Sequence, residues 1–152
     1  MDDSARWMGL HPLPVVVAAL LLGHACYTDL RWRKVRNGAV VAACVFGVVL
    51  GVMGGWPGVL HTALGLAAGG TWWIAVALCG FGSGDAKLAM AVGALLGPVP
   101  ALAGPAVGCV LCALAILPWA AVRRSLGRPW RGEEIPLAPW IAAGVVLASM
   151  WH

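Results

Sequence analysis

Two aspartates, Asp29 and Asp85, are the residues whose type and surroundings point most directly to chemistry. Only four acidic residues lie beyond the N-terminal tail, and these two stand beside long apolar stretches, where an ionisable group is costly and usually functional. Two carboxyl groups placed close together cannot both ionise cheaply, so one keeps its proton while the other is charged. The charged member can activate water, and the protonated member can polarise a peptide carbonyl and assist the leaving nitrogen. Such a pair favours peptide-bond hydrolysis without a metal or a nucleophilic side chain.

The apolar stretches that position these acids predict a membrane protein. Hydrophobic residues make up 61% of the 152 residues and charged residues 11%, against about 45–50% and about 25% in soluble domains. We expect an all-α, polytopic integral membrane bundle whose six helices lie between the charged clusters, at Pro12 to Tyr27, Gly38 to Met53, Val59 to Cys79, Ala86 to Leu96, Ala101 to Val122 and Pro136 to Trp151. A bilayer core takes about 20 helical residues, so the fourth segment is short. It must extend into its loop or lie inside the bundle.

Basic residues set the orientation of these helices. The positive-inside rule places short loops rich in Lys and Arg on the cytoplasmic side. Nine of the ten basic residues fall in or directly flank the first, third and fifth connections, namely Arg31, Arg33, Lys34, Arg36, Lys87, Arg123, Arg124, Arg128 and Arg131. Both termini are therefore expected outside. The first helix then ends at Asp29 and the fourth begins at Asp85, so the parity of the spans alone brings both carboxyl groups to the cytoplasmic face.

Structural roles for the two acids remain open at this point. Asp85 follows Ser83 and Gly84 and could cap the fourth helix, where the helix dipole favours an anion. Asp29 lies at a helix C-terminus, where the dipole is unfavourable, but the neighbouring arginines could make it part of a solvated charge cluster. Thr28 and Ser83 adjoin the acids and could either hydrogen-bond to them or cap the local backbone.

Other features of the composition argue against further classes of site. The formal charge of +4 follows from the basic loops, so we expect no nucleic-acid partner. Cys109 and Cys112 have CxxC spacing but no second cysteine pair or histidine cluster nearby, so we predict no metal and no cofactor. Glycines at small-xxx-small spacing, such as Gly65 with Gly69 and Gly93 with Gly97, predict close helix packing.

Three segments resemble one family of membrane proteases. Phe81-Gly-Ser-Gly-Asp-Ala-Lys-Leu88 contains the GxGD pattern of intramembrane aspartyl proteases, which is weak alone. It becomes specific beside Tyr27-Thr-Asp-Leu-Arg-Trp-Arg-Lys-Val-Arg-Asn37, which is similar to a pattern of prepilin peptidases, the type IV leader peptidase family. The segment from Glu134 to Gly144 resembles the Pro-containing start of that family's last helix. The resemblance thus runs from Asp29 to Gly144.

The resemblance implies roles for individual residues. Asp29 and Asp85 take the catalytic roles, and Gly82 and Gly84 would let the backbone approach an extended substrate. Three further residues match the pattern as supporting structure, namely Lys87, Asn37 and Pro136. Arg36 departs from the pattern, because the family commonly has Pro there, and this leaves the start of the second helix uncertain.

The resemblance also implies a function. The chain is similar to the short peptidases of tight-adherence (Flp) pilus systems, with residues 1–152 forming a single membrane-embedded peptidase domain and no cytoplasmic methyltransferase or zinc domain. It would remove basic leaders from prepilin or pseudopilin precursors by cleaving after Gly at the cytoplasmic face of the bacterial inner membrane. Its expected partners are these precursors and the lipid bilayer. Glu133 and Glu134 are the acids best able to receive a basic leader, and the alternative is that they are solvated loop charges. No oligomeric state is predicted.

Two other classes of function remain as alternatives. Paired carboxylates in membranes also serve proton relays, so a small transporter or proton-handling subunit is possible. A relay favours acids at mid-bilayer and inverted repeats, whereas these acids lie at one face and no convincing repeat is seen. A structural subunit of a secretion system is the third possibility, with both acids serving only as caps or ion-pair partners.

Overall fold

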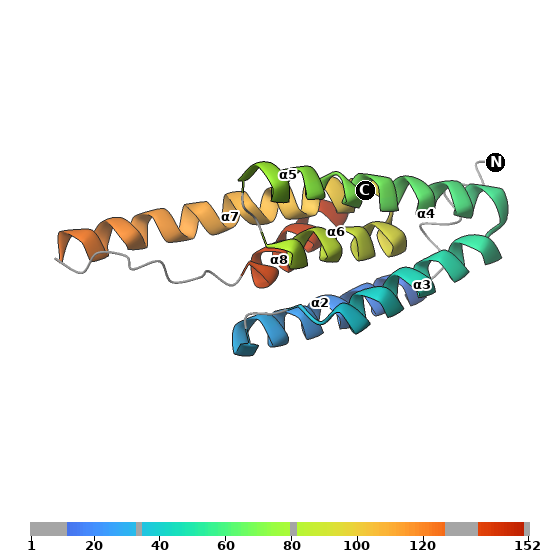
Figure 1. Ribbon diagram of the computed structural model, residues 1–152, viewed down its shortest axis with the longest axis horizontal. Coiled ribbons are helices and arrows are strands. Elements are labelled where there is room, and N and C mark those ends of the chain that lie inside the picture. The colour runs from blue at the N-terminus through green and yellow to red at the C-terminus, as the bar shows by residue number, and fades with distance from the viewer. Residues whose placement is uncertain (1–11, 33–34, 80–81, 127–136, 151–152) are drawn as a thin grey trace.

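A computed structural model describes residues 12–32, 35–79, 82–126 and 137–150 of the chain. Within these ranges the ordered elements are all α-helices, which confirms the all-α class (Figure 1). The helices are α2 (Pro12–Trp32), α3 (Asn37–Met53), α4 (Gly55–Gly70), α5 (Trp72–Cys79), α6 (Ser83–Leu96), α7 (Pro98–Ser125) and α8 (Ala138–Ser149).

The observed helices correspond to the six predicted segments. Three are long and apolar enough to cross a membrane, namely Pro12–Trp32, Gly55–Leu78 and Pro98–Val122. Helices α3 and α8 are shorter but also apolar. These lengths and compositions support a membrane protein, as expected from the separation of charged and apolar residues.

The third predicted segment differs from expectation because it contains two helices. Helix α4 ends at Gly70 and α5 begins at Trp72, with Thr71 between them in a near-helical conformation. The Thr71 hydroxyl donates a hydrogen bond of 2.7 Å to the Ala68 carbonyl. Such back-bonding by Thr, next to a pair of glycines, commonly bends a helix. The two helices still follow one another as a single long apolar rod (Figure 1).

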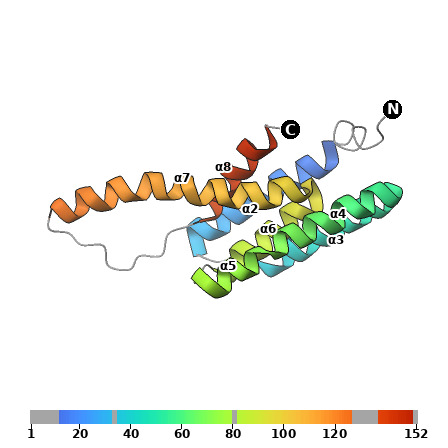
Figure 2. The same ribbon diagram turned by 90° about the horizontal axis from the view of Figure 1, so that it is seen from above.

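Helix α6 occupies the centre of the bundle. It has only 14 residues, and it packs against α2, α3, α4, α5 and α7 (Figure 2). Most of its residues from Ala86 to Leu95 are fully buried. The short fourth segment is therefore shielded by its neighbours, which was one of the two expected solutions to its length.

Glycines allow the helices around this centre to approach closely. A Cβ added at Gly65 of α4 would collide with the Gly93 carbonyl of α6, and one at Gly69 would meet the Ala89 carbonyl at 2.5 Å. Helices α7 and α8 make a similar contact, where Gly144 faces the Gly104 carbonyl. The predicted packing role of Gly65, Gly69 and Gly93 is confirmed.

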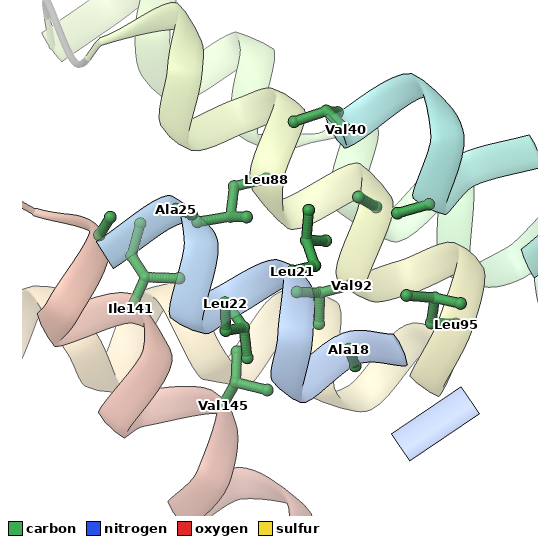
Figure 3. Packing of buried hydrophobic residues seen from close by; sticks show 13 residues of the cluster. Ala18, Leu21, Leu22, Ala25, Val40, Leu88, Val92, Leu95, Ile141 and Val145 are labelled. Carbon is green, nitrogen blue, oxygen red and sulfur yellow. The ribbon is translucent and has the colours of Figure 1, made fainter. Parts of the chain in front are cut away.

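Three helix termini lie together at one end of the bundle, namely the end of α2 and the starts of α6 and α8 (Figure 2). The start of α2 and the end of α8 lie at the opposite end. Below these termini the apolar core includes Ala25, Leu88 and Ile141, which are essentially fully buried and lie beside one another (Figure 3). This layer supports the end of the bundle that carries both aspartates.

Candidate active site

Asp29 lies in the last turn of α2 and is bound to the start of α8. Its Oδ2 atom accepts a hydrogen bond of 3.0 Å from the backbone N–H of Ala138, the first residue of α8. A carboxylate at a helix C-terminus is disfavoured by that helix's dipole, whereas the N-terminus of another helix favours it. Helix α8 therefore offsets the unfavourable position of Asp29 in α2, and it satisfies one of its own unpaired N–H groups in doing so.

Asp85 is the third residue of α6, beside the glycine that caps this helix. Its backbone N–H donates to the Gly82 carbonyl at 3.0 Å. Asp85 thus lies in the first turn of α6, where the helix dipole favours an anion. A capping role for its side chain stays a prediction.

The core layer brings the two acids to one place. Asp29 follows Ala25 by one turn of α2, and Asp85 precedes Leu88 by one turn of α6, so each acid shares a helix face with its core residue. Since Ala25 and Leu88 are neighbours in the core (Figure 3), the acids lie above the same layer. The packing therefore brings both acids to one end of the bundle, as the parity of the spans predicts, and the membrane face at that end stays a prediction.

The two glycines of the GxGD segment serve different contacts. A Cβ at Gly82 would meet the Asp85 Oδ2 atom at 3.3 Å, so glycine leaves room for the carboxyl group. A Cβ at Gly84 would meet the Val35 Cγ2 atom at 3.2 Å, so glycine there allows α6 to begin directly against the residues that precede α3. Both glycines hold the Asp85 region in place, and their predicted contact with substrate stays a prediction.

Lys87 and Asn37 contact one another, although they are far apart in sequence. The Lys87 ammonium donates a hydrogen bond of 3.0 Å to the Asn37 Oδ1 atom. The bond joins the fifth residue of α6 to the first residue of α3. Arg36, which replaces the family's Pro, is the N-cap of α3 with φ of −74°. This is close to the φ of about −65° that a Pro ring imposes, so Arg36 adopts a backbone φ that Pro would also adopt.

Other residues singled out in the sequence have different positions. Thr28 is buried and donates to the Ala25 carbonyl at 3.2 Å, so its hydroxyl caps the backbone of its own helix. Pro136 and the two glutamates, Glu133 and Glu134, lie outside the described residues. Among the residues that are described, no three His, Cys, Asp or Glu side chains converge as a metal-binding group would.

A small pocket adjoins the Asp85 carboxyl. Each of four segments contributes two residues to its lining. Helix α5 contributes Trp72 and Val76, α6 contributes Asp85 and Ala86, α7 contributes Pro105 and Cys109, and the start of α8 contributes Leu137 and Ile141. The Trp72 indole N–H donates to the Ala101 carbonyl at 3.0 Å, which fixes this ring against α7. One carboxyl group therefore stands in the wall of a mostly apolar pocket.

Sequence reasoning did not find Ala138 or Cys109. The segment from Glu134 to Gly144 had been singled out, but the contact with Asp29 is made by the backbone of Ala138, two residues after Pro136. A backbone N–H leaves no signal in residue type. The sequence distinguishes Cys109 only by its CxxC spacing with Cys112, and that spacing does not indicate a position beside Asp85.

The comparison with protein families agrees with this geometry. The type IV leader peptidase family matches residues 16–117, which include both aspartates and the pocket residues of α5, α6 and α7. The chain belongs to this family, and membership implies a membrane-embedded protease with a leader-peptidase-like function. The segment from Glu134 to Gly144 lies beyond the matched range. No curated protein and no solved structure matches the chain.

Proposed function

We propose that the protein is an aspartic endopeptidase that removes leader peptides from prepilin-type precursors, with Asp29 and Asp85 as its catalytic pair. The observation that carries the proposal is the placement of both acids above one core layer, with Asp29 bound to the first N–H of α8 and Asp85 in the first turn of α6. Membership of the type IV leader peptidase family supports the same reaction class. The ionised carboxyl activates a water molecule, and the protonated one polarises the scissile carbonyl.

Cleavage takes place after Gly at the cytoplasmic face of the inner membrane in this proposal. The six helical segments span the bilayer, with α4 and α5 as one span and both termini outside. The basic residues at the aspartate end of the bundle, among them Arg31, Arg36 and Lys87, support this orientation. The reaction is proteolysis without N-methylation, carried out by a single membrane domain.

The supporting glycines and polar residues act through position. Gly82 and Gly84 keep the start of α6 close to its neighbours, and their bare backbone leaves space for an extended peptide. Lys87 and Asn37 hold α6 and α3 together at the same end. Pro136 would shape the approach to α8, whose first N–H binds Asp29.

The test is co-expression of a prepilin-type precursor with the wild type, Asp29→Asn or Asp85→Asn, with leader removal read by mass. Asn keeps the shape of Asp and removes its ionisation, so each single variant should lose at least about a thousandfold in rate, as expected when an acid or base is removed. Asp2→Asn, which removes a carboxyl group from the N-terminal tail, is the matched control. Membrane abundance is measured for every variant.

Unimpaired cleavage by either Asn variant would exclude the two-aspartate mechanism. A proton-handling role predicts a different result, in which both variants lose proton flux in vesicles and precursor processing is unaffected. A purely structural role predicts that the variants change assembly of a secretion apparatus or membrane abundance, again with processing intact.

A further inference from the structure

We propose that α5 is a movable wall of the active site, and that the precursor passes Asp85 from the lipid side when this helix swings outward about Thr71. The proposal rests on the proposed peptidase function. It adds the route by which the peptide enters and the element that opens it.

The pocket beside Asp85 is too small for a peptide as it stands. Its volume is about 10 Å³, which is room for about one water molecule. The Asp85 carboxyl stands in its wall, so a peptide chain can extend past this carboxyl on the pocket side only if a wall moves. The walls are α5, α6, α7 and the start of α8.

Three of these walls are fixed by backbone contacts along their length. A Cβ at Gly65 or Gly69 of α4 would collide with the backbone of α6. A Cβ at Gly108 of α7 would meet the Trp140 carbonyl of α8 at 2.6 Å. Helices packed this closely cannot separate without losing contacts over several turns. Helices α6, α7 and α8 are therefore the rigid side of the pocket.

Helix α5 is held much more weakly. It has eight residues, it lies at the edge of the bundle (Figure 1), and none of its residues from Trp72 to Leu78 is buried. Its first two residues donate hydrogen bonds from their indoles, Trp72 to the Ala101 carbonyl and Trp73 to the Met90 thioether, a weak acceptor. From Ile74 to Leu78 the side chains are hydrocarbon and cannot hydrogen-bond. The part of α5 nearest its C-terminus is thus free to move.

The two faces of α5 define the direction of opening. Trp72 and Val76 line the pocket. Ile74 and Leu78, which are 61% and 79% exposed, each follow one of these residues by two positions, or about 200° around the helix. They lie on the opposite face, which faces lipid in a membrane. Helix α5 therefore separates the pocket from lipid, and its outward movement opens the pocket toward the bilayer.

The break between α4 and α5 supplies the pivot. Gly69 is packed against the Ala89 carbonyl of α6, which fixes the end of α4. A Cβ at Gly70 meets nothing within 4 Å, and the Thr71 hydroxyl donates to the Ala68 carbonyl at 2.7 Å. A glycine followed by a back-bonding Thr is a point where a helix bends. The chain can therefore turn at residues 70 and 71 while α4 stays in place.

Stiffening the pivot is the first test, with kcat/KM for leader removal measured for the full-length enzyme in lipid. Gly70→Ala creates no clash and favours the helical conformation that this residue has in the structure. It should raise the melting temperature and lower kcat/KM about fivefold, which corresponds to about 1 kcal/mol, the difference in helix propensity between Gly and Ala. Gly23→Ala of α2 is the control, and it should raise stability at wild-type kcat/KM.

Locking α5 to α6 is the second test. Trp73→Cys and Met90→Cys are combined, because these side chains contact one another, and a short bis-methanethiosulfonate reagent bridges the two thiols until a reductant releases them. The bridged enzyme should lose at least about tenfold in kcat/KM and recover on reduction. Each single-cysteine variant receives the same treatment and should keep its rate, which controls for the native cysteines.

Cleavage by the bridged enzyme at its reduced rate would overturn the movable wall. If the double variant does not accumulate in the membrane, Gly70→Ala decides alone, and a wild-type kcat/KM there rejects the proposal. A wild type that cleaves no precursor would instead reject the proposed peptidase function, so the two failures are distinguishable.

Discussion

The Asp29 carboxylate accepts a hydrogen bond of 3.0 Å from the backbone N–H of Ala138, which lies 109 positions later in the chain. The contact joins the end of α2 to the start of α8 and links one proposed catalytic acid to a helix N-terminus. A peptide N–H that donates to a carboxylate fixes its orientation. The role of α8 in the proposed mechanism is therefore to hold Asp29.

Removing this N–H should slow cleavage. Ala138→Pro deletes the donor at the first position of α8, where Pro is tolerated, although it also disfavours the αR conformation of the preceding Leu137. A hydrogen bond to a charged group contributes about 1.5–3 kcal/mol, so we expect kcat/KM to fall by at least about tenfold. The rate of leader removal by purified enzyme is the measurement.

The matched control for this change is Ala138→Val, because Ala138 is fully buried and both substitutions add volume. Val retains the N–H and should keep more activity than Pro. Equal losses in the two variants would show that packing, and not the hydrogen bond to Asp29, accounts for the effect.

Gly82 should matter more for activity than for stability. In Gly82→Ala the new methyl group would lie 3.3 Å from the Asp85 Oδ2 atom, so the carboxyl group must shift by a few tenths of an ångström. Gly82 has φ of −66°, which Ala adopts without strain. We expect cleavage to fall about tenfold with a change in unfolding free energy below about 1 kcal/mol.

Leader removal and thermal unfolding in detergent are measured together for Gly82→Ala. Gly38→Ala is the control, because a Cβ there meets no atom within 4 Å. Full activity of Gly82→Ala would mean that the Asp85 carboxyl does not need its present position.

The hydrogen bond between Lys87 and Asn37 should appear as energetic coupling. Lys87→Met and Asn37→Ala each remove one partner of an exposed bond, so each is expected to lower stability by no more than about 1 kcal/mol. The double variant should lose less than the sum of the two single losses, because the bond can be removed only once. A double-mutant cycle by thermal unfolding measures the coupling, and strictly additive losses would contradict it.

Contact between α4 and α6 should be intolerant of any side chain at Gly93. Gly93→Ala places a methyl group against the Gly65 carbonyl, and backbone atoms cannot move aside as a flexible side chain would. We expect a loss of about 1–3 kcal/mol, as for overpacked cores, and reduced membrane abundance.

Gly23 of α2 is the control position for Gly93, because a Cβ there meets nothing within 4 Å. Gly23→Ala should be neutral or stabilising by up to about 1 kcal/mol, since Ala is the better helix former. The two variants are compared by resistance to thermal unfolding. Equal stability would mean that α4 and α6 do not approach as closely as the structure shows.

The sequence by itself determined the helices and the end of the bundle at which the acids lie. Apolar stretches between charged clusters predict helices because backbone groups in a membrane must be satisfied within the segment. Two predicted spans lie between Asp29 and Asp85, and an even number of spans returns the chain to the end from which it started. The glycines at small-xxx-small spacing likewise predict that neighbouring helices approach closely, since only residues without a large side chain permit this approach.

The tertiary structure alone decided which groups complete the site. Every residue type except Pro carries a backbone N–H, so no sequence motif identifies the N–H of Ala138 as the partner of Asp29. Cys109 shares its surroundings in the sequence with other apolar residues of α7, and only the packing of four segments places it beside Asp85. The break at Thr71 also depends on a local hydroxyl bond that competes with the helix. Local composition fixes which segments are helical, whereas contacts across 50 to 109 positions depend on how those helices pack.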